Sequence, residues 1–307
     1  MQRQVYDMII LGGGPGGYTA ALYAARAGLN TLVLEKLSAG GQMALTHQID
    51  NYPGFPEGID GFELGERMQQ QAERFGAQTE YAQVLSVSLA ESPKVLHTDS
   101  DDFYGHTVVI ATGADPKKLG LPNEQALVGK GVAYCAACDG QFYRGKTVAV
   151  IGGGNSAAAD ALLLSRIAKK VYLVHRRDSL RADKASAAGL YKAGNVEFIW
   201  NSTAEALLQD DKLTGLKLKN VHSGEESTLP VDGVFISIGR KPVTDFLLGE
   251  LALDPEGYIP AGENTATQIP GVYAVGDVRT KQLRQIVTAV ADGAQAVHTA
   301  EKYLSNQ

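Results

Sequence analysis

Two stretches of the chain follow one pattern and decide its fold. They are residues 6–35, YDMIILGGGPGGYTAALYAARAGLNTLVLE, and residues 147–175, TVAVIGGGNSAAADALLLSRIAKKVYLVH. Each begins with a continuous apolar run, which is typical of a parallel strand buried on both faces. A glycine turn then leads into a helix, expected at about 15–27 and 155–168, and into a second strand at 31–35 and 171–174. Two such β-α-β units predict two nucleotide-binding domains.

Each turn carries the glycine fingerprint of dinucleotide-binding folds, GxGxxG in the first unit and GxGxxA in the second. The first glycine permits a tight turn, the second lets a pyrophosphate approach the backbone, and the third position lets helix and strand pack closely. Phosphates then bind free N–H groups at the helix N-terminus. The residues expected to form the two cradles are Gly12, Gly14, Pro15 and Gly17, and Gly152, Gly154, Asn155 and Ser156.

The end of the second strand in each unit predicts which nucleotide binds there. Glu35 ends the first, where a carboxylate accepts hydrogen bonds from ribose hydroxyls and would repel a 2′-phosphate. In the second unit the equivalent position is His175, followed by Arg176 and Arg177. Guanidinium groups make charge-assisted bonds to phosphate. We therefore expect FAD or NAD in the first unit and NADP in the second.

Two further strand-to-turn segments fit a flavin domain. Residues 108–113, VVIATG, are a strand that enters a glycine turn, and residues 272–277, VYAVGD, are a strand that ends in Asp277. That carboxylate could accept hydrogen bonds from the sugar-alcohol chain of FAD. Apolar residues from Leu283 to Leu304 then predict an amphipathic helix. Its N-terminus, near 284–285, would stabilise a reduced, anionic flavin.

The two cysteines, Cys135 and Cys138, admit three interpretations. A zinc site needs about four ligands, and the sequence offers no second cysteine pair and no paired histidine spacing. A structural disulfide closing so short a loop contributes only about 2 kcal/mol and would be reduced in the cytosol. A redox-active CxxC pair exchanges through a mixed disulfide. Asp139 could then protonate a leaving thiolate, or it could simply cap a turn before Gly140.

Together these motifs resemble the low-molecular-weight thioredoxin reductases. The resemblance rests on CAACDG at 135–140, GGGNSA at 152–157, HRRD at 175–178 with Arg181, Glu35-Lys36, GGQ at 40–42, NYPG at 51–54, and GDV at 276–278 through Arg284-Gln285. It covers the chain from Tyr6 to about Leu304. It implies an α/β fold of two Rossmann-like dinucleotide-binding domains. The NADPH domain, expected at 115–244, is inserted into an FAD domain of 1–114 plus 245–307.

The resemblance also implies a reaction. A hydride passes from NADPH through FAD to the Cys135–Cys138 disulfide, and the dithiol reduces oxidised thioredoxin in a homodimer. Cys138 would face the flavin, Cys135 would attack the thioredoxin disulfide, and Asp139 would be the acid. Family FAD contacts match Gly14, Glu35, Gln42, Asn51 and Asp277, and 2′-phosphate contacts match Arg176, Arg177 and Arg181. We also assign to cofactor binding Lys36, Gly41, Ala111, Thr112, Gly113, His175, Gly276, Arg284 and Gln285.

Departures from the family pattern are modest. Ala137 replaces the usual threonine, and an acidic pair is reduced to Ala159 and Asp160. Two related enzyme classes fit the sequence less well. Ferredoxin-NADP reductases share the two-domain plan but lack the cysteine pair that this chain has. Dithiol oxidases of this fold lose the NADPH arginines that this chain keeps. Reduction of another thioredoxin-like or peroxiredoxin-linked protein, or a non-catalytic flavin redox sensor, remain alternatives.

Composition narrows the partners and compartment. The net charge of −6 argues against nucleic acid binding. There is no apolar run long enough to span a membrane, and the N-terminus lacks the segments of a secretory signal. We therefore expect a cytoplasmic protein without a resident metal.

Overall fold

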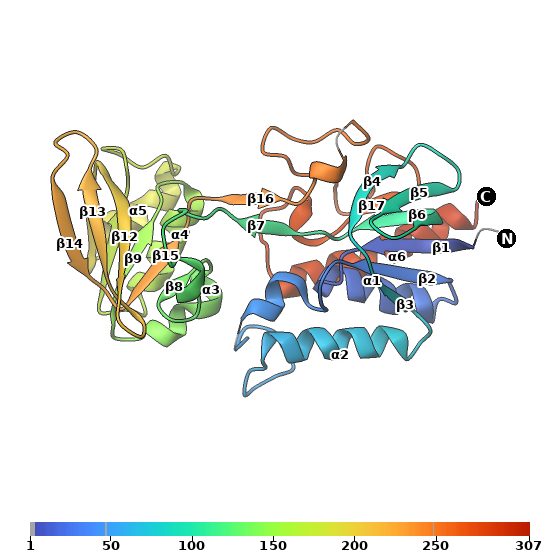
Figure 1. Cartoon of the computed structure of the whole chain (residues 1–307), viewed down its shortest axis with the longest axis horizontal. Helices are drawn as coiled ribbons and strands as arrows, with labels where there is room; N and C mark the ends of the chain where they lie inside the picture. Colours follow the sequence, from blue (N-terminus) through green and yellow to red (C-terminus); the bar gives the residue numbers. More distant parts are fainter. Residues whose placement is uncertain (1–3, 47, 248) are drawn as a thin grey trace. The chain divides into compact units, whose positions relative to one another are not determined.

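The structure is a computed structural model that describes residues 4–46, 48–247 and 249–307, except for the side chains of 185–186. It divides into two compact units, Met1–Asp115 with Lys241–Gln307, and Pro116–Arg240. The second unit is thus inserted into the first (Figure 1). It begins one residue later and ends four residues earlier than the expected 115–244. The reason is that Val243 belongs to the first unit, where it donates to Gly113 (3.0 Å) and accepts from Thr112 (2.7 Å).

The sheet of the first unit has the order β3-β2-β1-β6-β5-β4, and β17 also pairs with β6. Its parallel strands are β1 (Val5–Leu11), β2 (Thr31–Glu35), β3 (Gln78–Tyr81), β6 (Asp102–Ile110) and β17 (Val272–Ala274). The antiparallel strands are β4 (Val84–Ser88) and β5 (Lys94–Thr98). The chain leaves β1 toward β2 on one side, while β6 lies on the other, so the strand order reverses beside β1. Ligands of parallel α/β sheets bind at the carboxyl ends of strands at such a point.

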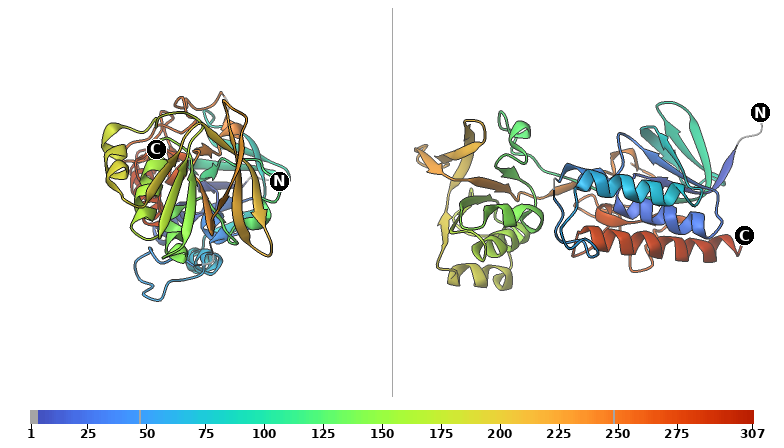
Figure 2. Two further views of the ribbon diagram at one scale, coloured as in Figure 1. Left: turned by 90° about the vertical axis from the view of Figure 1, so that its left-hand side faces the viewer. Right: turned by 90° about the horizontal axis from the view of Figure 1, so that it is seen from below.

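Helices cover one face of this sheet. They are α1 (Pro15–Arg26), α2 (Gly61–Glu73) and α6 (Ile286–Leu304), and the right-hand view of Figure 2 shows α1 lying between the other two. Met8 and Ile10 of β1 point into this layer. A Cβ atom on Gly293 of α6 would collide with the carbonyl oxygen of Gly16 in α1. Helices α1 and α6 therefore pack closely where Gly16 and Gly293 meet, next to the first glycine turn.

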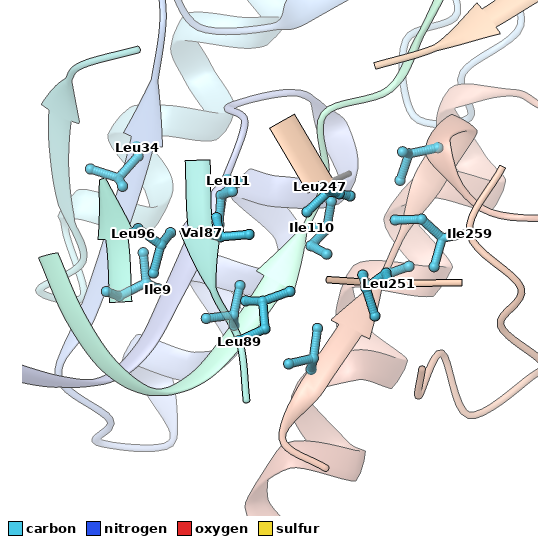
Figure 3. Packing of buried hydrophobic residues seen from close by; sticks show 14 of the residues in the cluster. Ile9, Leu11, Leu34, Val87, Leu89, Leu96, Ile110, Leu247, Leu251 and Ile259 are labelled. Carbon is cyan, nitrogen blue, oxygen red and sulfur yellow. The ribbon is translucent and has the colours of Figure 1, made fainter. Parts of the chain in front are cut away.

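The opposite face carries a second apolar cluster. Ile9 and Leu11 point into it, as the period of two along a strand requires. Figure 3 shows them packed with Val87 of β4 and with Leu247 and Ile259 from the C-terminal part of the chain. The sheet is therefore buried on both faces, which explains the continuous apolar runs of its strands.

The second unit repeats this plan. Its parallel sheet has the order β11-β10-β9-β15-β8, and a separate antiparallel sheet has the order β12-β13-β14. The parallel strands are β8 (Val132–Ala133), β9 (Thr147–Ile151), β10 (Lys170–Val174), β11 (Val196–Ile199) and β15 (Gly233–Ile236). The helices are α3 (Ala136–Asp139), α4 (Asn155–Ser165) and α5 (Lys184–Lys192), and the antiparallel strands are β12 (Ser202–Gln209), β13 (Leu213–Asn220) and β14 (Glu226–Pro230).

The remaining elements are short. Strands β7 (Ala114–Pro116) and β16 (Arg240–Pro242) pair with each other where the chain passes between the units. The 3-10 turns are η1 (Gly41–Leu45), η2 (Gln125–Leu127), η3 (Gly140–Tyr143), η4 (Asp245–Leu247) and η5 (Gly276–Val278). Within the three described ranges of the chain, no helix combines the length and the apolar character needed to cross a membrane.

The helix expected to end near Ala168 ends at Ser165. The C-terminal helix begins at Ile286, directly after the N-terminus expected near 284–285, and Leu283 lies before it. Gln285 adopts an extended conformation and exchanges capping hydrogen bonds with Thr288, which fixes the start of that helix.

Candidate functional site

The first glycine turn joins β1 to α1. Gly12 has a φ of +102°, and a Cβ there would lie 2.7 Å from the carbonyl oxygen of Ala111. A Cβ on Gly17 would collide with the carbonyl oxygen of Gly12. Gly14 differs, because no described atom lies within 4 Å of a Cβ built on it. The turn therefore leaves an open cradle at the N-terminus of α1, where backbone N–H groups can bind an anion.

The carboxylate of Glu35 binds three backbone N–H groups. Oε2 accepts from Gly13 at 2.6 Å, and Oε1 accepts from Lys36 at 2.8 Å and Leu37 at 3.0 Å. The side chain thereby fastens the end of β2 to the glycine turn. Gly13 was not among the predicted cofactor residues, although a Cβ there would lie 2.8 Å from the Tyr18 ring and 3.0 Å from Glu35. The signal was a third consecutive glycine that the fingerprint does not require.

The segment 40–42 crosses the first glycine turn. Gly40 donates its N–H to the carbonyl oxygen of Gly13 at 2.8 Å. A Cβ on Gly41 would lie 3.5 Å from the Cα of Gly14. The structure therefore brings this segment, which the sequence marked as cofactor-binding, next to the open cradle.

The turn that follows β6 lies on the other side of β1. Ala111 donates its N–H to the carbonyl oxygen of Leu11 at 2.8 Å, directly before the glycine turn. Farther along, Asp115 accepts a hydrogen bond of 2.8 Å from the Gln42 side chain. The segments around 42 and 111–115 thus converge on the carboxyl end of β1.

Asp292 of α6 stabilises the turn at Gly276–Val278 through hydrogen bonds. Oδ2 of Asp292 accepts from the Gly276 N–H at 2.9 Å, from Arg279 at 2.9 Å and from Lys281 at 2.7 Å, and Oδ1 accepts from Arg279 at 2.7 Å. Burial raises the pKa of Asp292, but these donors outweigh burial and hold the pKa below its ordinary value. No pattern in the sequence predicted this buried network.

Arg284 and Gln285 precede α6. Arg284 donates to the carbonyl oxygen of Asp277 at 3.3 Å and lies over the Tyr258 ring at 4.1 Å. Gln285 accepts a hydrogen bond of 3.0 Å from the Asn51 side chain. Three segments that the sequence assigned to FAD binding, around 51, 277 and 284–285, therefore meet through side-chain hydrogen bonds.

The second glycine turn joins β9 to α4. A Cβ on Gly152 would collide with the carbonyl oxygen of Ser237, which follows β15. No described atom lies within 4 Å of a Cβ built on Gly154, the N-cap of α4. Asn155 and Ser156 are exposed on the first turn of the helix. The second unit therefore has the same open cradle as the first.

His175 ends the second strand of this unit and is buried, with 5% of its surface exposed. A Cβ on Gly153 would collide with its ring, so this glycine, which was not predicted either, makes room for the histidine. Nε2 of His175 has no hydrogen-bond partner among the described residues. Burial first, and then the charges of the nearby arginines, lower the pKa of His175, so the ring is neutral at pH 7. These arginines are Arg181, Arg177 and Arg176.

The three arginine side chains are exposed. Within the described part of the chain, none has a side-chain hydrogen bond or an ion pair with a carboxylate. Arg181 is attached to the cradle through its own N–H, which donates to the carbonyl oxygen of Gly153 at 2.7 Å. The second unit therefore presents exposed cationic groups, which form no ion pair within the described residues, next to an open cradle, and this is the chemistry of a phosphate site.

The cysteines form a disulfide at the start of α3, with Cα atoms 5.3 Å apart. Cys135 is the N-cap of this helix, and its sulfur accepts the N–H of Cys138 at 3.2 Å. Both cysteines and Asp139 are half-buried, whereas Ala137 between them is exposed. Asp139 also donates its N–H to the carbonyl oxygen of Cys135 at 3.0 Å. The three predicted catalytic residues thus lie together on one helical turn of the second unit.

Asp160 is a further titratable group beside the second cradle. Its Oδ2 accepts a hydrogen bond of 2.5 Å from Ser237, whose carbonyl oxygen lies against Gly152. Burial raises the pKa of Asp160, and the Ser237 hydroxyl and the Arg240 charge only partly oppose it. The sequence marked Asp160 as a departure from the family pattern and did not predict this contact.

Comparison with known proteins identifies the family. A family model described as "Pyridine nucleotide-disulphide oxidoreductase" matches residues 6–293. The chain belongs to this family. It is 45% identical over 304 residues to the thioredoxin reductase of Listeria monocytogenes, covering 99% of this chain and 95% of that protein. It is 46% identical over 304 residues to the thioredoxin reductase of Streptomyces coelicolor, covering 98% and 94%.

A solved structure, the thioredoxin reductase from Streptococcus pyogenes, matches with a TM-score of 0.92 and 40% identity over 100% of both chains. The predicted resemblance to thioredoxin reductases is therefore confirmed. The predicted fold class of two Rossmann-like domains, one inserted into the other, is confirmed as well. Membership of this family confirms that the chain is an oxidoreductase.

Proposed function

We propose that this protein is an NADPH-dependent thioredoxin-disulfide reductase that carries FAD. The observation that carries the proposal is a CxxC disulfide in a chain with two dinucleotide cradles of different charge. When bound, NADPH would supply a hydride and FAD would relay its two electrons to the disulfide. The thioredoxin reductases among its relatives support thioredoxin as the substrate.

The first unit fits FAD. Gly14 leaves space that a Cβ would fill, as close approach of a pyrophosphate requires. A carboxylate has about four acceptor positions, and Glu35 uses three of them for backbone N–H groups. One position remains for a ribose hydroxyl, and the negative charge disfavours a 2′-phosphate. Asn51, Asp277 and Gln285 would hold the rest of the flavin nucleotide.

The second unit fits NADPH. Gly154 leaves the same space for a pyrophosphate. Where the first unit has a carboxylate, the second has a neutral histidine followed by two exposed arginines, Arg176 and Arg177. Arg181 is tied to the same turn through Gly153. Three cations without protein partners in the described structure are suited to the 2′-phosphate that distinguishes NADPH from NADH.

The cysteines would reduce the protein substrate by thiol–disulfide exchange. In the dithiol form, the Cys135 thiolate attacks one sulfur of the substrate disulfide and forms a mixed disulfide, while the other substrate sulfur leaves as a thiolate. Cys138 then attacks Cys135, which regenerates the internal disulfide and releases the second substrate thiolate. Asp139 would supply a proton to a leaving thiolate.

Two further assignments come from the resemblance. We propose that the protein is a homodimer and that it works in the cytoplasm. Light scattering on the purified protein at several concentrations tests the homodimer. The mass of a single chain at every concentration would contradict it.

Serine variants of the two cysteines test the function. In Cys135→Ser, the remaining Cys138 thiolate should give a long-wavelength charge-transfer absorbance with the flavin, whereas Cys138→Ser should give none. Neither variant should turn over thioredoxin with NADPH. Ala137→Ser is the matched control, because it changes the exposed residue between the sulfurs and should retain turnover. Sustained thioredoxin reduction by either cysteine variant would refute the proposed exchange.

A further inference from the structure

The second unit contains a column of aromatic rings at its sheet edge. The sequence contains one tryptophan, Trp200, which follows the edge strand β11. Its ring stacks on Phe198 with centroids 4.9 Å apart, and Phe198 stacks on Tyr191 at 5.1 Å. Trp200 also meets the His175 ring edge-to-face, with centroids 6.4 Å apart. The column therefore runs from an exposed tyrosine to the histidine against the glycine turn.

The backbone around Trp200 also holds the segment that carries the arginines. The His175 N–H donates to Ile199 at 2.9 Å, and the His175 carbonyl oxygen accepts from Ser202 at 3.0 Å. Asn201, next to Trp200, donates to the carbonyl oxygen of Arg177 at 3.1 Å. Residues 175–177 lie beyond the end of β10 and outside any helix. Their position therefore depends on these three hydrogen bonds to residues 199–202.

His175 connects the column to the nucleotide cradle. Its ring fills the space that a Cβ of Gly153 would occupy, and its Nε2 has no partner in the described structure. Because the buried Nε2 makes no hydrogen bond to the protein, packing must hold that end of the ring, and Trp200 is an aromatic neighbour that meets it edge-to-face. A smaller residue at 200 would free the ring and loosen the start of the arginine segment.

We propose that Trp200 is a positioning residue for recognition of the nucleotide 2′-phosphate. It holds His175 against the glycine turn and thereby fixes the start of the segment that carries Arg176 and Arg177. This inference rests on the proposed function, because it assumes that the second unit binds NADPH. The competing explanation is that Trp200 only stabilises the sheet edge, in which case all nucleotides would be affected alike.

Two small nucleotides separate these explanations. The probe 2′,5′-ADP carries the 2′-phosphate, and 5′-AMP does not. Calorimetric titration of the FAD-loaded protein with each probe measures the contribution of the 2′-phosphate directly. We expect Trp200→Leu to weaken 2′,5′-ADP binding roughly three- to tenfold, the range of an aromatic contact. Binding of 5′-AMP should change by less than about twofold, a small fraction of one such contact.

Conservative and distant variants serve as controls. Trp200→Phe keeps an aromatic edge against His175 and should restore most of the 2′,5′-ADP affinity. Tyr191→Leu removes the far, exposed end of the same column and should leave both affinities unchanged. Flavin absorbance and the melting temperature of each variant show whether it is folded. In the unaltered protein, Trp200 emission should change on adding 2′,5′-ADP, a readout that needs no variant.

The outcomes are distinguishable. Equal losses for both probes, no loss for either, or an unchanged Trp200 emission while 2′,5′-ADP binds would each overturn the positioning role and leave the proposed function standing. If the unaltered protein bound both probes equally, the assignment of NADPH to the second unit would fail, and this inference with it.

Discussion

Replacing Gly154 with alanine should weaken NADPH binding and leave the fold intact. Gly154 has a φ of −94°, which any residue adopts, and no described atom lies within 4 Å of the added Cβ. Alanine is a poorer N-cap than glycine, but it loses less chain entropy on folding. These effects oppose each other at about 1 kcal/mol each. The melting temperature should therefore move by less than about 4 °C.

The effect on binding should be much larger. The added methyl group stands where a pyrophosphate must approach the N-terminus of α4. Loss of one hydrogen bond to a charged group costs about 1.5–3 kcal/mol, which is roughly a tenfold to hundredfold increase in Kd. Calorimetric titration with NADP⁺ measures this change, and flavin absorbance reports the other site in the same sample.

Gly14→Ala is the matched control, because the same space is open at the first cradle. It should lower FAD retention and leave NADP⁺ affinity in the remaining flavin-loaded protein unchanged. The reasoning is refuted if Gly154→Ala binds NADP⁺ with unaltered affinity, or if each alanine weakens both cofactors equally.

Three further predictions follow from the site. Changing Arg176 and Arg177 together to glutamine should raise the KM for NADPH strongly and that for NADH little, since only NADPH carries the 2′-phosphate; equal increases would mean that the arginines serve the fold. Glu35→Ala should lower the flavin content of the purified protein and Glu35→Gln should lower it less, because glutamine keeps one acceptor oxygen; full flavin in the alanine variant would contradict the assignment. Asp292 has a lowered pKa in the folded protein, so its stabilisation is present at neutral pH and is lost as the pH falls through that lowered value. Asp292→Asn should therefore lower the free energy of unfolding by about 3 kcal/mol at pH 7. The melting temperature of this variant should fall less on acidification than that of the unaltered protein, and an equal fall in both would contradict the role given to Asp292.

Local patterns in the sequence predicted the two β-α-β units, and the family resemblance implied that one domain is inserted into the other. The apolar runs before Gly12 and Gly152 form the central strands, and each glycine turn opens a helix as expected. The sequence also predicted the different charges of the two units. Glu35 in the first unit and the arginines after His175 in the second follow their glycine fingerprints at nearly the same distance. Such features depend on residues close together in the chain.

Long-range pairs were not predictable in this way. Ser237 and Asp160 are 77 residues apart, and Asn51 and Gln285 are 234 residues apart. No periodicity connects such positions, so only the fold reveals that they meet. The role of Gly153 was not predictable for a different reason. This position must lack a side chain because the ring of His175, 22 residues later in the chain, occupies the space.

The central claim is that electrons pass from NADPH to the Cys135–Cys138 pair and on to thioredoxin, and an anaerobic titration tests it most directly. The purified flavin-loaded protein is titrated with NADPH and then with oxidised thioredoxin while the flavin absorbance is followed. We predict uptake of roughly two equivalents of NADPH, because the flavin and the disulfide each accept two electrons. Oxidised thioredoxin should then restore the flavin absorbance. A flavin that NADPH does not bleach, or that stays bleached when oxidised thioredoxin is added, would contradict the account.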